Sequence, residues 1–253
     1  MIIRLDFNKK KYKTDLFRPF DISLPLNDGA NNPNCYWADP VKFETIAMEN
    51  FIGSVRAGGS VNYQKLTLTP HGNGTHTECY GHVSANETAT INKCLTSFHF
   101  VAEVISVSPE KLSNGDDLVT LRTLKEKIKH PNAEAVVLRT LPNTDLKKTQ
   151  QYSGANPPYI EAAVTEYLAS QGVNHLLIDL PSIDREQDDG KLLAHKAFWK
   201  LSESTRKQST ITELIYVDTA IPDGLYLLNL QIASLEMDAS PSKPVLYKLE
   251  EVL

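Results

Sequence analysis

Short runs in which apolar and polar residues alternate recur along the chain and predict a strand-rich molecule. Residues 61–69 are a clear case, because they alternate and include β-branched side chains, a combination typical of a strand. The runs in the C-terminal third alternate as well, whereas residues 135–139 have the short apolar pattern of a buried strand. The predicted strands cover residues 1–7, 21–24, 61–69, 100–107, 135–139, 173–179, 213–217, 224–232 and 245–249.

Helical spacing of apolar residues is confined to two segments. Residues 159–170 follow two prolines and end just before Gly172, and their apolar side chains fall on one helical face. Residues 121–128 predict a shorter helix, with Thr120 as its N-cap. The order strand, helix, strand over residues 135–179 predicts a parallel crossover unit. We therefore expect one mixed α/β domain that spans residues 1–253 and contains more strand than helix.

Composition and charge exclude several classes of protein. Hydrophobic residues make up 41% of the 253 positions, which argues against intrinsic disorder. Lys and Arg number 26 and Asp and Glu number 31, a net charge of −5, and the one tight basic cluster is Lys9–Lys11 with Lys13. We therefore expect no nucleic acid partner. No apolar run approaches the ~20 residues that a membrane helix needs, so no membrane partner is expected either.

Location is predicted from the N-terminus and the cysteines. Residues 1–7 lack a basic segment followed by an apolar one, so they are interpreted as a strand and not as a signal peptide. Cys35, Cys79 and Cys94 are too few and too far apart for a disulfide framework or a zinc ribbon. The expected location is the cytoplasm.

Candidate chemistry is concentrated between His71 and His82, a twelve-residue segment that holds three of the seven histidines. His76 and Glu78 are two residues apart, so on an extended segment they point to the same side, where an imidazole and a carboxylate can bind a divalent metal. His82 is a candidate third ligand or general acid/base. Gly72 and other glycines permit a sharp turn that brings His71 close. Cys79 is expected to face away from the cluster as a small buried residue.

The segment Gly74–Glu78, followed by His82, resembles the H-x-G-T-H-x-D-x-P-x-H signature of the cyclase-like metal-dependent hydrolases. This family includes bacterial kynurenine formamidase and isatin hydrolase. The resemblance continues in the same order along nearly the whole chain. Similar segments are DISLPL at 21–26, VLRT at 137–140, LIDLPSID at 177–184, His195-Lys196, ITE at 211–213 and the closing hairpin at 224–245.

The resemblance implies a swivelling β/β/α fold, a homodimer or higher oligomer, and one or two divalent ions, zinc or manganese. It implies that His82 is the acid/base and that Trp37, with Tyr36 beside it, contacts the substrate. Trp37 as plain core packing remains open. By position, the resemblance makes ligands of His76, Glu78, His195 and Glu213.

Three departures from the signature matter. Gly72 stands at the family's first histidine, and His71 replaces that ligand only if the loop bulges. Glu78 replaces an aspartate and reaches one methylene further. Tyr80 replaces a proline and either lines the substrate pocket or packs in the core. Asp184 either orients a ligand histidine or caps a turn.

The sequence therefore predicts a metal-dependent hydrolase, similar to an arylformamidase or cyclic amidase, that acts on a small molecule. It would cleave a C–N bond of an amide, formamide or lactam, or a C–O bond, through an activated water. Two alternatives remain. One is a binding protein on the same scaffold with an incomplete site, and the other is a metal-dependent lyase or dehydratase.

Overall fold

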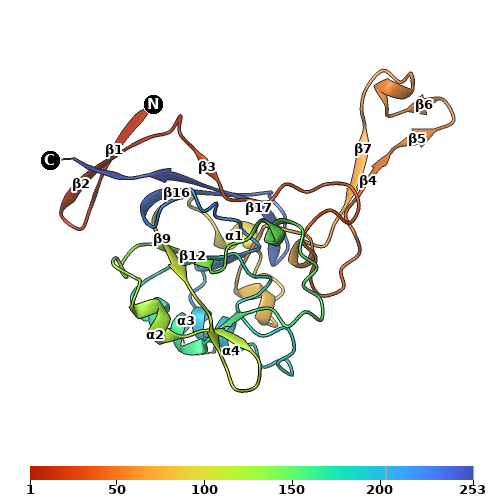
Figure 1. Cartoon of the computed structure of the whole chain (residues 1–253). Helices are drawn as coiled ribbons and strands as arrows, with labels where there is room; N and C mark the ends of the chain where they lie inside the picture. The colour runs from red at the N-terminus through yellow and green to blue at the C-terminus, as the bar shows by residue number, and fades with distance from the viewer. Residues whose placement is uncertain (203, 253) are drawn as a thin grey trace.

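Seven strands close into a barrel-like ring in the computed structural model, which describes residues 1–202 and 204–252 (Figure 1). The ring closes because β16 pairs with both β9 and β17, and the short strand β3 (Phe20–Asp21) pairs with β17 as an eighth member. In ring order the strands are β16 (Gly224–Ile232), β9 (His99–Val107), β12 (Ala135–Thr140), β14 (His175–Ile178), β15 (Thr210–Glu213), β8 (His76–Glu78) and β17 (Ala239–Lys248). The expected strand-rich α/β architecture is confirmed.

Four neighbouring strands of the ring, β9, β12, β14 and β15, run parallel. Helix α3 (Ala162–Ser170) connects β12 to β14, which confirms the predicted crossover unit. Parallel strands bring their carboxyl ends to one edge of a sheet, where polar groups of different strands meet. β8 is antiparallel to β15 and places His76 opposite Glu213 at that edge.

Helices α2 (Leu121–Lys125), α3 and α4 (Leu193–Trp199) lie together on one side of the ring (Figure 1). Thr165 of α3 donates a hydrogen bond to the carbonyl of Ala194 in α4 at 2.8 Å. The remaining helical turns are α1 (Ile91–Cys94) and the 3₁₀ turns η1 (Val55–Ala57), η2 (Pro70–Gly72), η3 (Tyr80–Val83) and η4 (Asp145–Lys148). Among the described residues, no helix has the length and apolar character needed to cross a membrane.

Two smaller sheets extend the body. β1 (Ile2–Phe7), β2 (Lys10–Asp15) and β18 (Glu250–Val252) join the two ends of the chain, and the apolar side of this sheet packs on Val101 and Leu227 of the ring. Three of the four lysines of the basic cluster thus lie on β2, where Lys10 and Lys13 pair with Glu251 and Glu250. The second sheet contains β10 (Glu110–Lys111), β11 (Asp117–Val119) and β13 (Tyr159–Ile160).

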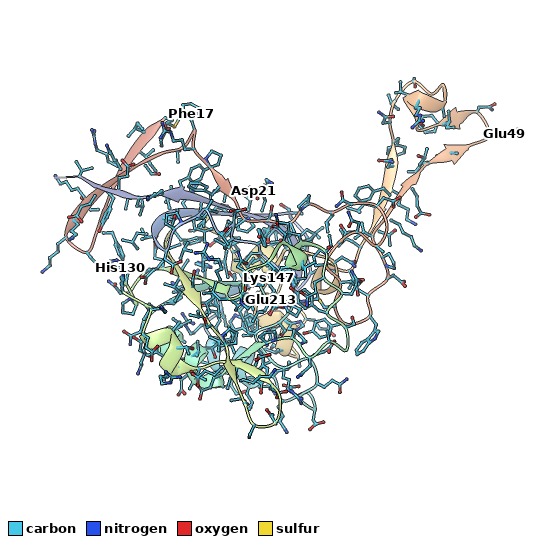
Figure 2. The ribbon with its side chains drawn as sticks, in the orientation of Figure 1. Phe17, Asp21, Glu49, His130, Lys147 and Glu213 are labelled. Atoms are coloured by element: carbon cyan, nitrogen blue, oxygen red, sulfur yellow. The ribbon has the colours of Figure 1, made fainter. Side chains whose placement is uncertain are left out.

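An arm formed by residues 42–67 projects from the body, with Glu49 at its outer end (Figures 1 and 2). Its strands are β4 (Lys42–Thr45), β5 (Ala47–Met48), β6 (Phe51–Ile52) and β7 (Gln64–Thr67), paired β4 with β7 and β5 with β6. β7 confirms part of the predicted strand 61–69. The chain leaves the arm directly into η2, so the arm and the histidine segment are continuous.

Several predicted boundaries were wrong. The helix expected at 121–128 ends at Lys125, the strand expected at 245–249 begins at Ala239, and three other differences have a clear structural cause. The helix expected from residue 159 begins at Ala162, because Tyr159 and Ile160 instead pair with β11. The strand expected at 213–217 lies at 210–213, because Leu214 adopts a left-handed φ of 53° that ends the extended run. The strand expected at 21–24 covers 20–21, because the Leu24 amide donates to the hydroxyl of Thr75 at 2.8 Å and leaves the sheet.

Candidate metal centre

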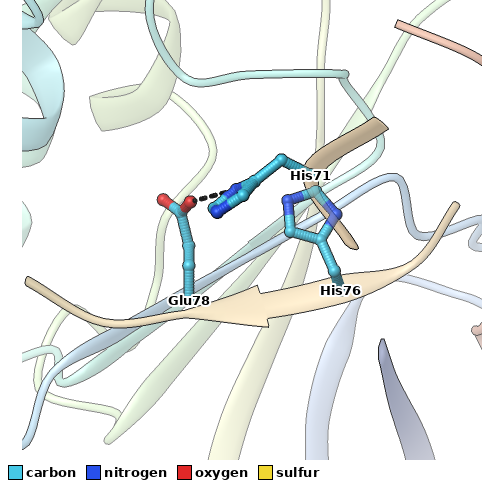
Figure 3. A group of neighbouring side chains, drawn as sticks. All are labelled: His71, His76 and Glu78. Carbon is cyan, nitrogen blue, oxygen red and sulfur yellow. Dashed lines mark ion pairs between the residues drawn. The ribbon is translucent and has the colours of Figure 1, made fainter. Parts of the chain in front are cut away.

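Strand β8 directs His76 and Glu78 to the same side, as its two-residue period requires (Figure 3). Neither side chain has measurable solvent exposure. Glu213, opposite His76 in β15, brings its Oε2 to 3.4 Å from His76 Nε2. These three side chains form the floor of a buried histidine–carboxylate cluster.

His71 enters the cluster from η2, above β8 (Figure 3). Its Nδ1 lies 3.1 Å from Glu78 Oε2. Gly72 packs so closely on the Tyr36–Trp37 loop that a Cβ there would lie 2.3 Å from the Cβ of Ala38. Gly74, with φ of 111°, completes the turn back into β8. The structure therefore brings His71 into the cluster while leaving no room for a side chain at position 72.

His195 arrives from the other side of the cluster, on α4, which the sequence patterns did not predict. Its Nε2 lies 3.0 Å from Glu78 Oε1 and 3.7 Å from Glu213 Oε1. Glu213 Oε1 also accepts the amide of Ile183 at 2.9 Å, which fixes that carboxylate. The five side chains expected to be ligands, His71, His76, Glu78, His195 and Glu213, are thus together.

Each of the three inner histidines has one ring nitrogen held by an acceptor outside the cluster. His71 Nε2 donates to Asp238 at 2.8 Å, His76 Nδ1 to the carbonyl of Gly74 at 3.0 Å, and His195 Nδ1 to Asp184 at 2.6 Å. The opposite nitrogen of each ring faces the carboxylates. Metal-binding histidines are commonly oriented by such outer acceptors, which also fix the ring tautomer.

Two buried atoms of the cluster have no hydrogen bond among the described residues, namely His76 Nε2 and Glu78 Oε2. His76 Nε2 carries a lone pair, since Nδ1 donates, yet it faces a carboxylate oxygen of Glu213. Two acceptors at 3.4 Å in a dry site repel each other unless a cation or proton lies between them. His71 Nδ1 is near Glu78 Oε2 but lacks hydrogen-bond angles. Imidazole nitrogens and carboxylates aimed at shared space fit a divalent cation such as zinc or manganese.

Electrostatics in the cluster follow from burial and close opposite charges. Burial lowers the pKa of His71, but the hydrogen bond to Asp238 and the nearby Glu78 charge outweigh it and raise this pKa to about 10. Burial also lowers the pKa of His195, and contacts with Asp184 and Glu78 raise it to about 10. Burial raises the pKa of Glu78, but His82 and His195 bring it well below the usual range. The carboxylate is therefore ionised in a strongly polar pocket.

His82 lies at the mouth of the cluster, on η3, with 29% of its side chain exposed. Its Nδ1 is 3.3 Å from Asp238 Oδ2 and 3.8 Å from Glu78 Oε2. Its ring lies over His71, with centroids 4.3 Å apart. His82, His71 and Asp238 thus form the accessible side of an otherwise buried site.

Sequence patterns did not single out Asp238. It lies 156 residues from His82 and just before β17, and a single carboxylate there carries no local signal. Strand pairing between β8 and β17 alone brings it to the cluster. Asp184 serves both roles considered for it, because Oδ2 contacts His195 and Oδ1 accepts the amide of Ala194.

The three aromatic candidates differ in position. Trp37 is 66% exposed, so it is not packed in the core, and its amide donates to Ser153 Oγ at 2.8 Å. Burial of the Tyr36 hydroxyl, with the Glu213 charge nearby, raises its pKa, although the residue as a whole is partly exposed. Tyr80 instead packs in the main apolar core, with its hydroxyl near the amide of Asn86.

Comparison with known proteins places this geometry in a family. The model of the family Cyclase, described as "Putative cyclase", matches residues 20–185. The chain belongs to the cyclase family. Kynurenine formamidase from Bacillus anthracis is 27% identical over 227 residues, which cover 89% of this chain and 95% of that protein.

Solved structures confirm the cyclase-like fold. An isatin hydrolase bound to the product analogue thioisatinate has a TM-score of 0.64 at 18% identity. The match covers 92% of this chain and 93% of the isatin hydrolase chain. A potential metal-dependent hydrolase with cyclase activity has a TM-score of 0.63 at 18% identity. The match covers 91% of this chain and 97% of that protein. The fold expected from the sequence resemblance is therefore correct.

Proposed function

We propose that this chain is a metal-dependent hydrolase that cleaves a C–N or C–O bond of a small acylated or cyclic molecule. The observation that carries the proposal is the inward aim of three imidazole nitrogens and two carboxylates. Two buried atoms of this cluster have no hydrogen bond within the part of the chain that the structure describes. Family membership and the names of the relatives support the same activity. The residues that would hold the ion are His71, His76, Glu78, His195 and Glu213.

A divalent ion bound by these residues supplies a Lewis acid for the substrate carbonyl and lowers the pKa of a water toward neutrality. Either zinc or manganese suits this mixture of imidazole and carboxylate groups. Asp184 keeps the Nε2 of His195 inward, and Gly74 does the same for His76. Burial of Glu78 and Glu213 excludes bulk water from one side of the site.

His82 is the proposed acid/base. Its Nδ1 faces a carboxylate, which accepts but does not donate, so the proton resides on Nδ1 and the lone pair on Nε2. A partly exposed imidazole at the mouth of the site can take a proton from the attacking water and return it to the leaving group.

Trp37 and Tyr36 are the proposed substrate contacts. Trp37 is the more exposed of the two and offers a face for an aromatic or acyl part of a substrate. Tyr36 adjoins Trp37, and the Glu213 charge helps raise the pKa of its hydroxyl. The relatives' names, kynurenine formamidase and isatin hydrolase, suggest aryl formamides and cyclic aryl amides as the first compounds to assay. Tyr80 is a weaker candidate, because it lies in the core.

The deciding experiment measures metal content and activity together. Wild type, His76→Ala and Glu78→Ala are purified without chelators, analysed by plasma mass spectrometry, and assayed on aryl formamides, lactams and lactones. We expect near-stoichiometric zinc or manganese in wild type and loss of metal and hydrolysis in both variants. Lys248→Ala, in the terminal region of β17, is the matched control and should retain both metal and hydrolysis.

Wild type that binds a small molecule but no divalent ion would favour a binding protein. Elimination products in place of hydrolysis would favour a lyase.

We also propose that the 253 residues act as one domain within a homodimer or higher oligomer. The projecting arm exposes a row of large apolar side chains, which is unusual for a surface that faces only water. They include Met48, Ile52, Val55, Val61, Tyr63 and Leu66. Light scattering after size exclusion should give at least twice the mass of 28.2 kDa, and replacing Ile52 and Leu66 by Ser should lower it.

A further inference from the structure

The carboxylate of Asp238 contacts two histidines through one oxygen. Its Oδ2 accepts from His71 Nε2 at 2.8 Å and lies 3.3 Å from His82 Nδ1. The two imidazole rings stack at 4.3 Å with 32° between their planes. One acceptor therefore sits at the edge of both rings.

The main chain holds this carboxylate in place. The carbonyl of Asp238 accepts the amide of Cys79 at 3.0 Å, and the carbonyl of Met237 accepts the amide of Ile91 at 2.7 Å. The next residue, Ala239, is paired with Glu78 in the β8–β17 ladder. Asp238 is thus anchored next to the strand that carries Glu78. The anchoring residue, Cys79, directly precedes the turn that carries His82.

We propose that Asp238 is a positioning residue that orients His71 and His82 together. The proposal rests on the proposed function. The Asp238 carboxylate would direct the candidate ligand His71 inward and would keep the lone pair of the acid/base His82 on Nε2. With the proton of His71 held on Nε2, Nδ1 points at Glu78. With the proton of His82 held on Nδ1, Nε2 is left to exchange a proton with water or leaving group.

Asp238 is the shared acceptor on which this arrangement depends. Without it, His71 loses the hydrogen bond on Nε2, and its ring, 24% exposed, is free to turn. His82, 29% exposed, loses the carboxylate 3.3 Å from Nδ1, which leaves only the longer approach to Glu78. Both rings lie at the accessible side of the site, where packing alone constrains them least.

The test compares Asp238→Ala and Asp238→Asn with wild type and with the matched control Glu236→Gln. Glu236 lies two residues earlier and accepts hydrogen bonds from Thr90 and Asn92, away from the histidines. The first readout needs no metal. In wild type and the control, NMR of ¹⁵N-histidine-labelled protein should show exchange-protected ring N–H protons for His71 Nε2 and His82 Nδ1. Asp238→Ala should lose both signals.

The second readout is the dissociation constant for zinc and for manganese, from competition with a chelator. Removing an outer partner of a metal-binding histidine typically weakens metal affinity by about 10–100-fold, and we expect that loss in Asp238→Ala, with Asp238→Asn between it and wild type. At saturating metal, kcat should fall by about 10²–10⁴-fold, the usual contribution of a positioned acid/base, with a smaller change in KM.

Unchanged ring N–H signals in Asp238→Ala would overturn the proposal, as would a wild-type dissociation constant and kcat in a folded Asp238→Ala. Equal losses in Glu236→Gln would also overturn it, because they would trace the effect to the loop as a whole. Wild type that binds neither metal would refute the proposed function instead, and the NMR comparison would still decide whether Asp238 orients the two rings.

Discussion

Asp184 holds His195 twice, once through its ring and once through its backbone. Its Oδ2 lies 2.6 Å from His195 Nδ1 and also accepts the His195 amide at 3.1 Å. Its Oδ1 accepts the amide of Ala194 at 2.8 Å, so one carboxylate caps the first turn of α4 from the preceding loop. The start of α4 and the aim of His195 therefore depend on the same side chain.

Replacing this carboxylate by an amide, Asp184→Asn, should weaken both functions. We expect metal affinity to fall by about 10–100-fold, because the histidine loses its outer anion. We expect the free energy of unfolding to fall by about 1 kcal/mol, because an anion at a helix N-terminus is lost. Chelator competition and urea denaturation measure the two effects.

Asp189→Asn is the matched control, because Asp189 lies in the same loop with 91% of its side chain exposed. It should change neither quantity appreciably. If Asp184→Asn lost stability but bound metal as tightly as wild type, Asp184 would be a helix cap alone.

Gly72 explains why the histidine stands one position earlier than in the family signature. A Cβ at residue 72 would lie 2.3 Å from the Cβ of Ala38, so Gly72→Ala should destabilise the fold by about 1–3 kcal/mol through overpacking. Removing the opposing methyl group in Gly72→Ala/Ala38→Gly should recover most of that loss in urea denaturation. Additive losses in the double variant would show that the contact with Ala38 is not the cause.

Lys147 forms a buried ion pair that the sequence analysis did not identify. Its Nζ lies 2.7 Å from Asp179 Oδ2 and 2.7 Å from the carbonyl of Thr140, at the ends of β12 and β14. Lys147→Met leaves the Asp179 charge buried without its partner, so it should destabilise the fold by about 3–5 kcal/mol. Lys148→Met, at a more exposed position, should cost far less.

The double variant Lys147→Met/Asp179→Asn separates the two causes of that loss. If the uncompensated charge dominates, the double variant should be more stable than Lys147→Met alone in urea denaturation. If the lost packing and hydrogen bonds of Lys147 dominate, the second substitution should destabilise the chain further.

The sequence predicted best where local pattern and tertiary packing agree. The strand at 224–232 follows from alternation of apolar and polar residues, and the crossover around α3 from two short apolar runs, because β12 and β14 are buried on both faces. His76 and Glu78 follow from a period of two. Residues 42–52 of the arm have little apolar periodicity and therefore carry no local signal. Helix α4 carries none either, because it is short and its first turn is capped by Asp184 from the preceding loop.

The candidate site was predictable only in part, for the same reason. Local spacing alone supports His76 and Glu78. His195 and Glu213 come from distant segments, and only the resemblance to the family singled them out. Asp238 reaches the site through pairing of β17 with β8, a contact between residues far apart in the chain that no local pattern encodes.

His175 makes stability depend on pH in the acidic range. It lies in β14 with 4% exposure, its ring stacks on Phe100 at 3.8 Å, and burial, aided by the Arg206 charge, lowers its pKa to about 3. Between pH 6.5 and about 3 the unfolded chain therefore binds a proton that the folded chain does not. Folding stability contributed by neutral His175 is present above pH 6.5 and is lost as the pH falls through this window.

The variant His175→Asn keeps a side chain able to hydrogen-bond Thr210 but cannot titrate. Between pH 6 and 4, its free energy of unfolding from urea denaturation should fall less steeply than that of wild type. The two slopes should differ by about 1.4 kcal/mol per pH unit, the value for one proton. His71 and His195 are unchanged in the variant, so their contribution to the pH dependence is the same in both proteins and cancels in the comparison. Equal slopes in the two proteins would show that His175 is already protonated in the folded state.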